Sequence, residues 1–392
     1  MSSLAARVRN LPATVFSEYS ALAARTGAVN LGQGFPDFDG PEEVREAAVH
    51  ALRTGVNQYA LGAGSANLRR AIAEHAVRFH RQAVDPEREV TVTAGATEAL
   101  FDALLGLLDP GDEAVLFEPF YDSYAAAVAM AGAVIRPVTL RPPDAGHPGW
   151  WFRTEELEAA FGPRTRVVVV NTPHNPTGKV FTRAELEQVA DACQRHRVVA
   201  LTDEVYEHLV FAPARHLRLA TLPGMAERTL TVSSGGKSFS YTGWKVGWAI
   251  GPAELRRAVA QPHQYVTFAV AAPLQEGIAH ALRLPDAYFE GLLAAYTARR
   301  DRLLSALRDA GFSPWAPEGA YFVCADVAGF GHPTDDAFCR WLTTEVGVAA
   351  IPLSAFYLRP ESAPPVARFA FCKTDTVLDE AARRLGRLPR LR

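Results

Sequence analysis

The sequence has few cysteines and no long apolar run, and each absence excludes a class of protein. Its four cysteines lie far apart, with no C-x-x-C pair and no metal-finger spacing: Cys193, Cys324, Cys339 and Cys372. We therefore expect buried free thiols without a chemical role. No stretch approaches the roughly 18 apolar residues of a membrane span, and residues 1–10 lack the apolar core of a signal peptide. These features predict a cytoplasmic protein without a membrane partner.

The chain also lacks an excess of charge of either sign. Its formal net charge is -3, with 21% charged and 48% hydrophobic residues, which is ordinary for a soluble globular enzyme. This balance argues against nucleic acid as a partner. The sequence has no internal repeat and no low-complexity tract, so a linear array is not indicated. A length of 392 residues suits two domains, at about 100–200 residues per domain.

Short apolar runs alternate with helical patterns between about residues 90 and 250. The runs lie at residues 90–93, 114–117, 133–135, 167–170, 198–201, 229–232 and 247–250. Helices are predicted at residues 98–108, 121–131 and 183–196, the last opened by a capping box of Thr182 and Glu185. Strands and helices in alternation predict an α/β fold, in which helices cover both faces of a mostly parallel sheet.

After Pro273 the pattern changes. A long helical stretch runs through residues 296–303, and a Gly/Pro-rich junction follows at residues 311–319. Strands are predicted at 320–324 and 367–371, with helices near 335–344 and 376–385. These elements predict a second, smaller α+β unit.

Polar side chains follow several of the predicted strands. Residues 95–98 end one strand and open a helix, whose free N–H groups suit a phosphate. Residues 171–178 form a stiff, amide-bearing turn after the strand at 167–170, and Asp203 and Tyr206 follow the strand at 198–201. Because ligands of such sheets bind beyond the carboxyl ends of the strands, we expect these groups to meet there.

A lone lysine follows the strand at 229–232, in a turn of small residues. Lys237 lies within Ser-Ser-Gly-Gly-Lys-Ser, and Lys245 follows eight residues later in Thr-Gly-Trp-Lys-Val-Gly-Trp. The glycines allow a ligand to approach both amines. We therefore expect an anionic, carbonyl-bearing ligand. An amide, a carboxylate, a phenol, an amine and a phosphate cradle are the groups that a pyridoxal phosphate ring needs.

At this point a family resemblance becomes clear. Residues 31–38, 118–122, 173–178 and 242–248 resemble the kynurenine, glutamine-phenylpyruvate and methionine aminotransferases. Residues 56–59, 121–124 and 203–209 also resemble N-succinyldiaminopimelate aminotransferases. The chain thus resembles a class I aminotransferase of fold type I over nearly its whole length. The resemblance implies a large domain at 40–285 with a seven-stranded sheet, and a small α+β domain made of 1–39 and 286–392.

The resemblance also assigns residues to the cofactor pyridoxal 5'-phosphate. Lys237 would form the Schiff base, Asp203 would pair with the pyridine nitrogen, and Tyr206 would act with Asn175 on the ring oxygen. The remaining cofactor residues would stack on the ring or hold the phosphate: Tyr121, Ser234, Lys245 and the backbone of Gly95, Ala96 and Thr97. Tyr59 would reach in from the other subunit of a homodimer with shared active sites.

Further residues are assigned to the substrate. Arg368 matches the arginine that binds the α-carboxylate, a task suited to a planar fork of donors. Gly34 would add a backbone contact, and Phe16 and Phe268 would line the pocket with Asn175. Phe16 stands where kynurenine-type relatives have tryptophan, and Thr97 stands where several have an aromatic residue.

Each of these residues also has an ordinary structural alternative. Lys237 could be a solvated surface charge, Asp203 a helix N-cap and Arg368 one half of a surface ion pair. Tyr206, Tyr121 and Phe268 could be plain core aromatics. No metal site is expected, because Glu204 and His208, four apart on a predicted helix face, suit a satisfied structural pair.

The resemblance implies transfer of an amino group from an L-amino acid of kynurenine, glutamine, methionine or aromatic type to a 2-oxo acid, by a ping-pong mechanism. Two alternatives use the same groups: N-succinyl-LL-diaminopimelate aminotransferase and cysteine-S-conjugate β-lyase. A pyridoxal-phosphate-binding regulator would need a DNA-binding module, and no basic helix-turn-helix precedes the pattern.

Overall fold

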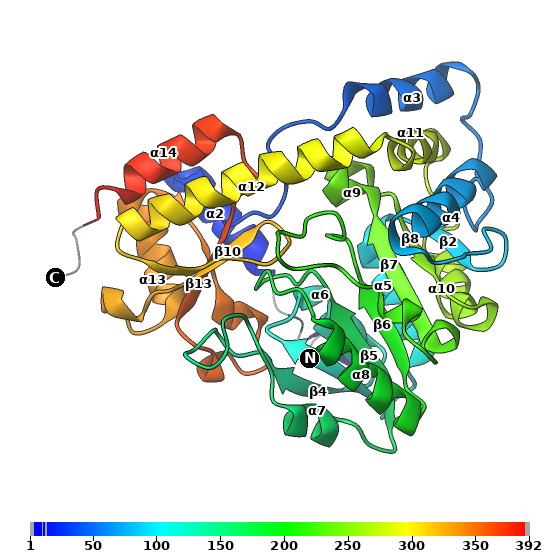
Figure 1. The fold of residues 1–392 in the computed structure, drawn as a ribbon, viewed down its shortest axis with the longest axis horizontal. Coiled ribbons are helices and arrows are strands. Elements are labelled where there is room, and N and C mark those ends of the chain that lie inside the picture. Colours follow the sequence, from blue (N-terminus) through cyan, green and yellow to red (C-terminus); the bar gives the residue numbers. More distant parts are fainter. Residues whose placement is uncertain (1–3, 10, 12–13, 389–392) are drawn as a thin grey trace.

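The computed structural model describes residues 4–9, 11 and 14–388, and two sheets organise them (Figure 1). Within these residues the larger sheet has seven strands in the order β2-β8-β7-β6-β5-β3-β4. Their bounds are Val90–Thr93 (β2), Glu113–Glu118 (β3), Val134–Thr139 (β4), Thr165–Asn171 (β5), Val199–Asp203 (β6), Thr229–Ser234 (β7) and Gly247–Ile250 (β8). Strands β3 to β7 pair in parallel, and β8 is antiparallel to both of its neighbours. All seven apolar runs form strands, so the predicted mostly parallel α/β sheet is confirmed.

Helices cover both faces of this sheet because its central strands are apolar on both sides. Val167 and Val169 pack with α5 and α6, whereas Val168 and Val170 pack with α8. These helices are Gly95–Leu107 (α5), Asp122–Met130 (α6) and Arg183–His196 (α8). The capping box of α8 is confirmed: the Thr182 hydroxyl accepts from the Glu185 N–H at 3.3 Å, and the Glu185 carboxylate accepts from the Thr182 N–H at 2.8 Å.

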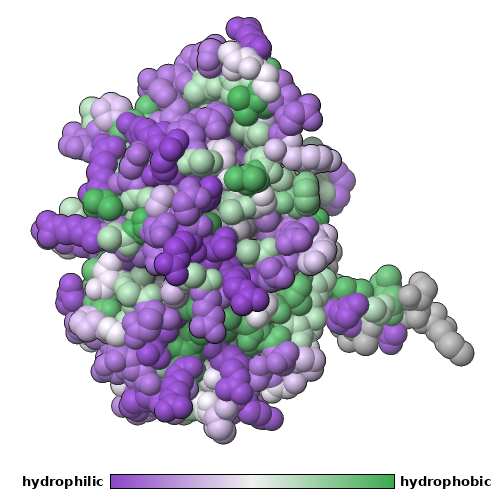
Figure 2. All heavy atoms as spheres, turned by 90° about the vertical axis from the view of Figure 1, so that its right-hand side faces the viewer, coloured by the Kyte–Doolittle hydropathy of each residue, from purple (hydrophilic) through white to green (hydrophobic). Residues whose placement is uncertain are grey.

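Helices α3, α4, α10 and α11 lie together on the right of Figure 1, beside β2 and β8. Their bounds are Glu42–Arg53 (α3), Ala66–His80 (α4), Ala253–Val266 (α10) and Ala272–Leu282 (α11). Figure 2 shows that hydrophilic side chains predominate on this side, with hydrophobic ones in small groups between them. None of the helices among the described residues has both the length and the apolar character that crossing a membrane requires.

The smaller sheet is antiparallel, with four strands in the order β12-β13-β10-β9 among the described residues. The strands are Ser313–Trp315 (β9), Phe322–Asp326 (β10), Ile351–Pro352 (β12) and Val366–Ala370 (β13). Near them lie helices Val15–Thr26 (α2), Asp286–Asp309 (α12), Asp335–Trp341 (α13) and Asp375–Leu385 (α14). The remaining α-helices and strands of the described residues are Ala6–Arg9 (α1), Val29–Asn30 (β1), Thr154–Ala160 (α7), Gly235–Ser238 (α9) and Val348–Ala349 (β11).

Strand β1 pairs in parallel with β11, so the N-terminal segment joins the C-terminal part of the chain. The division into domains at residues 39/40 and 285/286 stays a prediction. The four cysteines are buried and free, as expected.

Three predicted elements differ in the structure. Helix α5 begins at Gly95 rather than residue 98, because Gly95 adopts a φ of +81° and starts the helix directly at the strand end. The helical stretch after Pro273 is two helices, α11 and α12, separated before Pro285, which precedes the first residue of α12. The segment after Asp203 is a turn and not a helix, so Glu204 and His208 do not share a helix face.

Candidate active site

A cavity of about 290 Å³ opens at the carboxyl ends of the central strands. Thirteen of the fifteen predicted site residues line it: Phe16, Gly34, Gly95, Ala96, Thr97, Tyr121, Asn175, Asp203, Tyr206, Ser234, Lys237, Lys245 and Arg368. They come from both ends of the chain and from several strands of the large sheet. The topology therefore brings together groups that lie up to about 350 residues apart in sequence.

Lys237 lies on α9, the single helical turn that follows β7. Its Nζ is 3.5 Å from the carbonyl oxygen of Gly34 and 5.8 Å from the ring centroids of Tyr206 and Tyr321. Burial lowers the pKa of this amine, and the nearby charges of Lys245 and Arg368 lower it further. Lys237 therefore lines the cavity and is not a solvated surface charge.

Asp203 ends β6 and is buried at the floor of the cavity. Its Oδ2 accepts a 2.5 Å hydrogen bond from the hydroxyl of Tyr124, and its Oδ1 accepts from the Val205 N–H at 3.3 Å. Burial raises the pKa of this carboxyl to about 6. Because a turn follows, Asp203 is not a helix N-cap.

Arg368 lies on β13 and is fully buried, with no carboxylate of the described residues at ion-pair distance. Its Nη1 donates to Asn175 Oδ1 at 2.7 Å, and its Nη2 donates to the Gly32 carbonyl at 2.8 Å. The guanidinium lies 4.1 Å from the ring centroid of Phe322. Burial lowers its pKa to about 10. Its Nε has no protein partner, so this buried cation retains donors for an anion.

The first turn of α5 and Lys245 approach each other closely. A Cβ on Gly95 would lie 3.0 Å from Lys245 Nζ, and a Cβ on Gly247 would lie 2.5 Å from the Ala96 nitrogen. Glycine is therefore favoured at position 95 by its φ of +81° and at position 247 by the closeness of the backbone. Free N–H groups at a helix N-terminus beside an ammonium form an anion site of the kind that holds phosphate. Ser234, at the end of β7, lines the same cavity.

Aromatic side chains enclose the remaining walls. Tyr206 is buried, with its ring edge-on to Tyr321 at 4.9 Å. Phe16 lies 6.4 Å from Tyr121 and 5.7 Å from Phe356 between ring centroids. The hydroxyl of Tyr321 donates to the Gly34 carbonyl at 2.7 Å, which fixes that backbone at the rim.

Tyr59 and Phe268 do not line this cavity. They are 83% and 53% exposed, and their rings meet edge to face at 5.1 Å. The assignment of Tyr59 to a neighbouring subunit stays a prediction, and so does the pocket role of Phe268.

Several residues of the site were missed by sequence reasoning. Tyr124, Tyr321, Phe322 and Gln33 all contact the cavity or its buried groups. Tyr124 lies three residues, or one helical turn, beyond Tyr121, and that spacing was an available signal. Phe322 carried no such signal, because its ring lies against Arg368 only through the pairing of β10 with β13 in the small sheet.

The structure also corrects the predicted Glu204–His208 pair. Glu204 contacts His216 and Arg218, whereas His208 Nε2 lies 2.7 Å from His75 Nε2. The two side chains therefore have separate partners within one buried cluster.

The sequence model of the family described as "Aminotransferase class I and II" matches residues 26–385. With this match and the relatives below, the chain belongs to the class I and II aminotransferases and uses pyridoxal phosphate, as predicted. The buried Nε of Arg368 and the glycine-lined cradle beside Lys245 fit a ligand with a carboxylate and a phosphate.

Particular relatives are similar along nearly their whole length. The probable N-succinyldiaminopimelate aminotransferase DapC of Mycobacterium tuberculosis is 50% identical over 97% of each chain. A solved structure of the M. tuberculosis N-succinyldiaminopimelate aminotransferase has a TM-score of 0.95 at 50% identity, covering 98% of this chain and 99% of that one. The kynurenine–oxoglutarate transaminase of Dictyostelium discoideum is 40% identical over 94% of this chain and 92% of its own. The Escherichia coli methionine aminotransferase structure has a TM-score of 0.93 at 39% identity, covering 99% and 100%.

Proposed function

We propose that the chain moves an amino group between an L-amino acid and a 2-oxo acid in the Lys237 cavity, with N-succinyl-LL-diaminopimelate as its amino donor. The observation that carries this proposal is the convergence of three groups on one cavity: the Lys237 amine, the buried Asp203 carboxyl and the buried Arg368 guanidinium. Membership of the family supports the reaction class, and the relative at 50% identity supports the donor.

The bound cofactor supplies an aldehyde that takes up amino groups and a ring that accepts electrons. Lys237 would hold the aldehyde carbon, Asp203 the pyridine nitrogen, and Tyr206 and Asn175 the ring oxygen. The ring would lie beside Tyr121. The anion site formed by Ser234, Lys245 and the backbone of Gly95, Ala96 and Thr97 would hold the phosphate.

Arg368 would bind the α-carboxylate of the substrate. A guanidinium has five N–H donors, and the bonds to Asn175 and Gly32 use two of them. These two bonds orient the fork before the substrate arrives, which reduces the entropy lost on binding. The Nε donor without a protein partner supports this assignment.

Lys237 would also carry the proton of the reaction. Burial lowers the pKa of its amine, which favours the uncharged form that a general base needs. The Lys237 Nζ would act as the base that takes the proton from the substrate α-carbon and as the acid that returns it, while the bound cofactor would supply the electron sink.

The side-chain end of the cavity favours a long or bulky, uncharged group near the reacting carbon. The cations that line the cavity are Lys237, Lys245 and Arg368, and each already has a proposed role. Apart from Asp203, the other lining side chains are uncharged, and they include Phe16, Gln33, Phe35 and Phe322. A short acidic side chain would find no partner there, whereas the distant carboxylates of N-succinyl-LL-diaminopimelate would extend past Phe35, which is 44% exposed.

A second candidate donor is an amino acid of the kynurenine, methionine or aromatic type. The aromatic lining of Phe16, Tyr121 and Phe322 would pack against such a side chain. The relatives at about 40% identity with these activities in their names support this alternative.

A half-reaction screen tests the proposal. Each candidate donor is added singly to the loaded enzyme, and loss of the visible absorbance of lysine-bound pyridoxal phosphate is followed. We expect the fastest loss with N-succinyl-LL-diaminopimelate, slower loss with kynurenine, methionine, glutamine and phenylalanine, and the slowest with aspartate. Lys237→Ala should lack the absorbance and respond to none, whereas Lys179→Gln, at a buried lysine outside the cavity, should keep both. Fastest loss with aspartate would contradict the proposed donor, and an active Lys237→Ala would contradict the proposed site.

A further inference from the structure

The turn that carries Asp203 and Tyr206 also has a face that points away from the cavity and is buried. Asp203 and Tyr206 line the cavity, whereas Glu204 and Glu207 do not line it and are 0% and 7% exposed. Two carboxylates therefore stand behind the two residues that face the cofactor site. Buried carboxylates of this kind need complete sets of hydrogen-bond donors.

Every oxygen of Glu204 has a donor. Its Oε1 accepts from the Thr202 hydroxyl at 2.9 Å. Its Oε2 lies 2.9 Å from His216 Nε2 and accepts from Arg218 Nε at 3.1 Å. Burial alone would raise the pKa of Glu204, but the charges of His216 and Arg218 lower it below its ordinary value.

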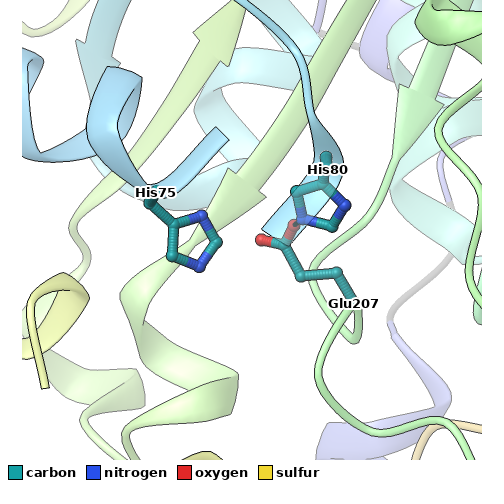
Figure 3. Close-up of side chains that lie close together, drawn as sticks. All are labelled: His75, His80 and Glu207. Atoms are coloured by element: carbon teal, nitrogen blue, oxygen red, sulfur yellow. Dashed lines mark ion pairs between the residues drawn. The ribbon is translucent and has the colours of Figure 1, made fainter. Parts of the chain in front are cut away.

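Glu207 is held in the same way. Its Oε1 accepts from the Ser233 hydroxyl at 2.8 Å, and its Oε2 accepts from Arg218 Nη2 at 2.7 Å. His80 Nε2, at the end of α4, lies 2.6 Å from the same Oε2. Figure 3 shows the imidazole of His80 against this carboxylate, with His75 from α4 on the other side. Burial opposes ionisation here too, but the positive charge of Arg218 holds the pKa of Glu207 well below its ordinary range.

Arg218 is the group that both carboxylates share. It is 1% exposed, and its third nitrogen, Nη1, donates to Gln82 Oε1 at 3.0 Å. A guanidinium is rigid and planar, so one Arg218 fixes the distance between the carboxylates of Glu204 and Glu207. These residues flank Val205 and Tyr206 in the turn. The spacing of the two glutamates therefore sets the conformation of the turn that presents Asp203 and Tyr206.

We propose that Arg218 is a positioning residue for Asp203 and Tyr206, acting from behind the cavity through Glu204 and Glu207. This inference rests on the proposed function for the roles of Asp203 and Tyr206. It assigns the buried histidine and glutamate cluster to alignment of the turn. The cluster is not assigned to cation binding, although His75, His80 and Glu207 lie close enough to share an ion, because Arg218 already occupies Glu207 Oε2.

Arg218→Lys is the variant that tests this. It keeps the positive charge, but a flexible ammonium lacks the rigid planar fork that fixes the separation of the two carboxylates. Arg69→Lys is the matched control: Arg69 is also buried, at 3% exposure, but it bonds to the Gly64 and Pro86 carbonyls and to Glu87.

The first measurement uses the cofactor-free protein. Hydrogen exchange is followed over residues 203–209, where the N–H groups of Glu204, Glu207 and Leu209 donate to Val232, Glu204 and Tyr206 at 2.8–2.9 Å. We expect about tenfold faster exchange or more in Arg218→Lys and no change in Arg69→Lys. Wild-type protection of this segment in Arg218→Lys would overturn the proposal, even if the melting temperature falls.

The second measurement uses the loaded enzyme. We expect a shifted pH titration of the visible absorbance and a kcat about 10- to 100-fold lower, with KM nearly unchanged, because the turn is misplaced while Arg368 is intact. An unchanged titration and kcat would overturn the proposal. Should Arg218→Lys be insoluble, Glu207→Gln, which keeps the side-chain shape, is measured in the same ways. If the wild type shows no turnover but Arg218→Lys still exchanges faster than the wild type, the positioning role of Arg218 is supported. The roles proposed for Asp203 and Tyr206 are then refuted.

Discussion

Lys237 and Asp203 share one physical condition, which is burial that moves a pKa toward neutrality. Burial lowers the pKa of the Lys237 amine, and it raises the pKa of the Asp203 carboxyl to about 6. A pair of groups shifted in this way is typical of sites that move protons near pH 7. The Tyr124 hydroxyl, which donates to Asp203 Oδ2, gives the carboxylate a fixed orientation.

The guanidinium of Arg368 should be required for tight substrate binding. In Arg368→Lys, the fork that spans Asn175, Gly32 and the substrate is replaced by a point charge. Loss of one or two charge-assisted hydrogen bonds should raise KM about 10- to 100-fold for both the amino acid and the oxo acid. Steady-state kinetics with each substrate varied in turn will measure this.

Arg300→Lys is the control, because Arg300 pairs with Asp301 outside the cavity. Equal KM values for wild type and Arg368→Lys would remove Arg368 from carboxylate binding.

At the scale of the element, helix α5 contains a destabilising group. Asp102 is fully buried in α5, and neither carboxylate oxygen has a hydrogen-bond partner. Burial, aided by the charge of Glu98, raises the pKa of Asp102 from 3.8 to about 7. The folded state therefore binds more protons than the unfolded state between these values, so the free energy of unfolding falls as pH rises through this window.

Asp102→Asn removes this titration. We expect the variant to be more stable than the wild type at pH 8, by on the order of 2 kcal/mol, and the difference to shrink toward pH 4. Urea denaturation at several pH values measures it. Asp109→Asn, at an exposed aspartate just beyond α5, should show no such trend. A pH-independent difference for Asp102→Asn would contradict the argument.

The elements themselves were largely predictable from local sequence, and the reason is the double burial of the central strands. Residues 167–170 are four valines buried on both faces, a pattern that few other structures produce. The start of α5 at Gly95 and the break before Pro285 were harder to predict from the sequence. Both depend on the backbone conformation of the connecting turn.

The site was predictable to the same degree and for a related reason. Lys237, Asp203 and Asn175 follow strand ends, and in this topology strand ends meet. Tyr321, Phe322 and the Arg218 cluster were not predictable in this way. Tyr321 depends on packing between the small and large sheets, Phe322 on the pairing of β10 with β13, and the Arg218 cluster on contacts behind the strand ends.

Considering the whole molecule, several large apolar side chains are exposed at the end of α10 and in the segment before α4. Tyr59, Leu61, Tyr265, Val266 and Phe268 are between 53% and 83% exposed. Phe268 adopts a φ of +69°, unusual for phenylalanine, with its ring against Tyr59. Patches of this kind mark protein interfaces. We propose that a second copy covers it, in a homodimer that brings Tyr59 to the neighbouring phosphate site.

Tyr265→Glu and Val266→Glu, at the end of α10, test this dimer. A buried charge at the interface should shift the protein toward monomer and weaken pyridoxal phosphate binding, because Tyr59 would be withdrawn from its neighbour. Light scattering and cofactor titration measure the two effects. Val134→Glu, at an exposed valine on the edge strand β4, is the control. A wild-type monomer with full activity would contradict the proposal.

The bond from Arg368 to the Gly32 carbonyl has a consequence for biosynthesis. It joins residues 336 positions apart, and the cavity wall between them is made from both ends of the chain. A ribosome makes residue 368 only after residue 32 and all seven strands of the large sheet. The nascent polypeptide can thus fold its central valine-rich strands first, but it gains the means to recognise a carboxylate only once β13 has been made, so fragments truncated before β13 should fold in part and remain unable to select a substrate.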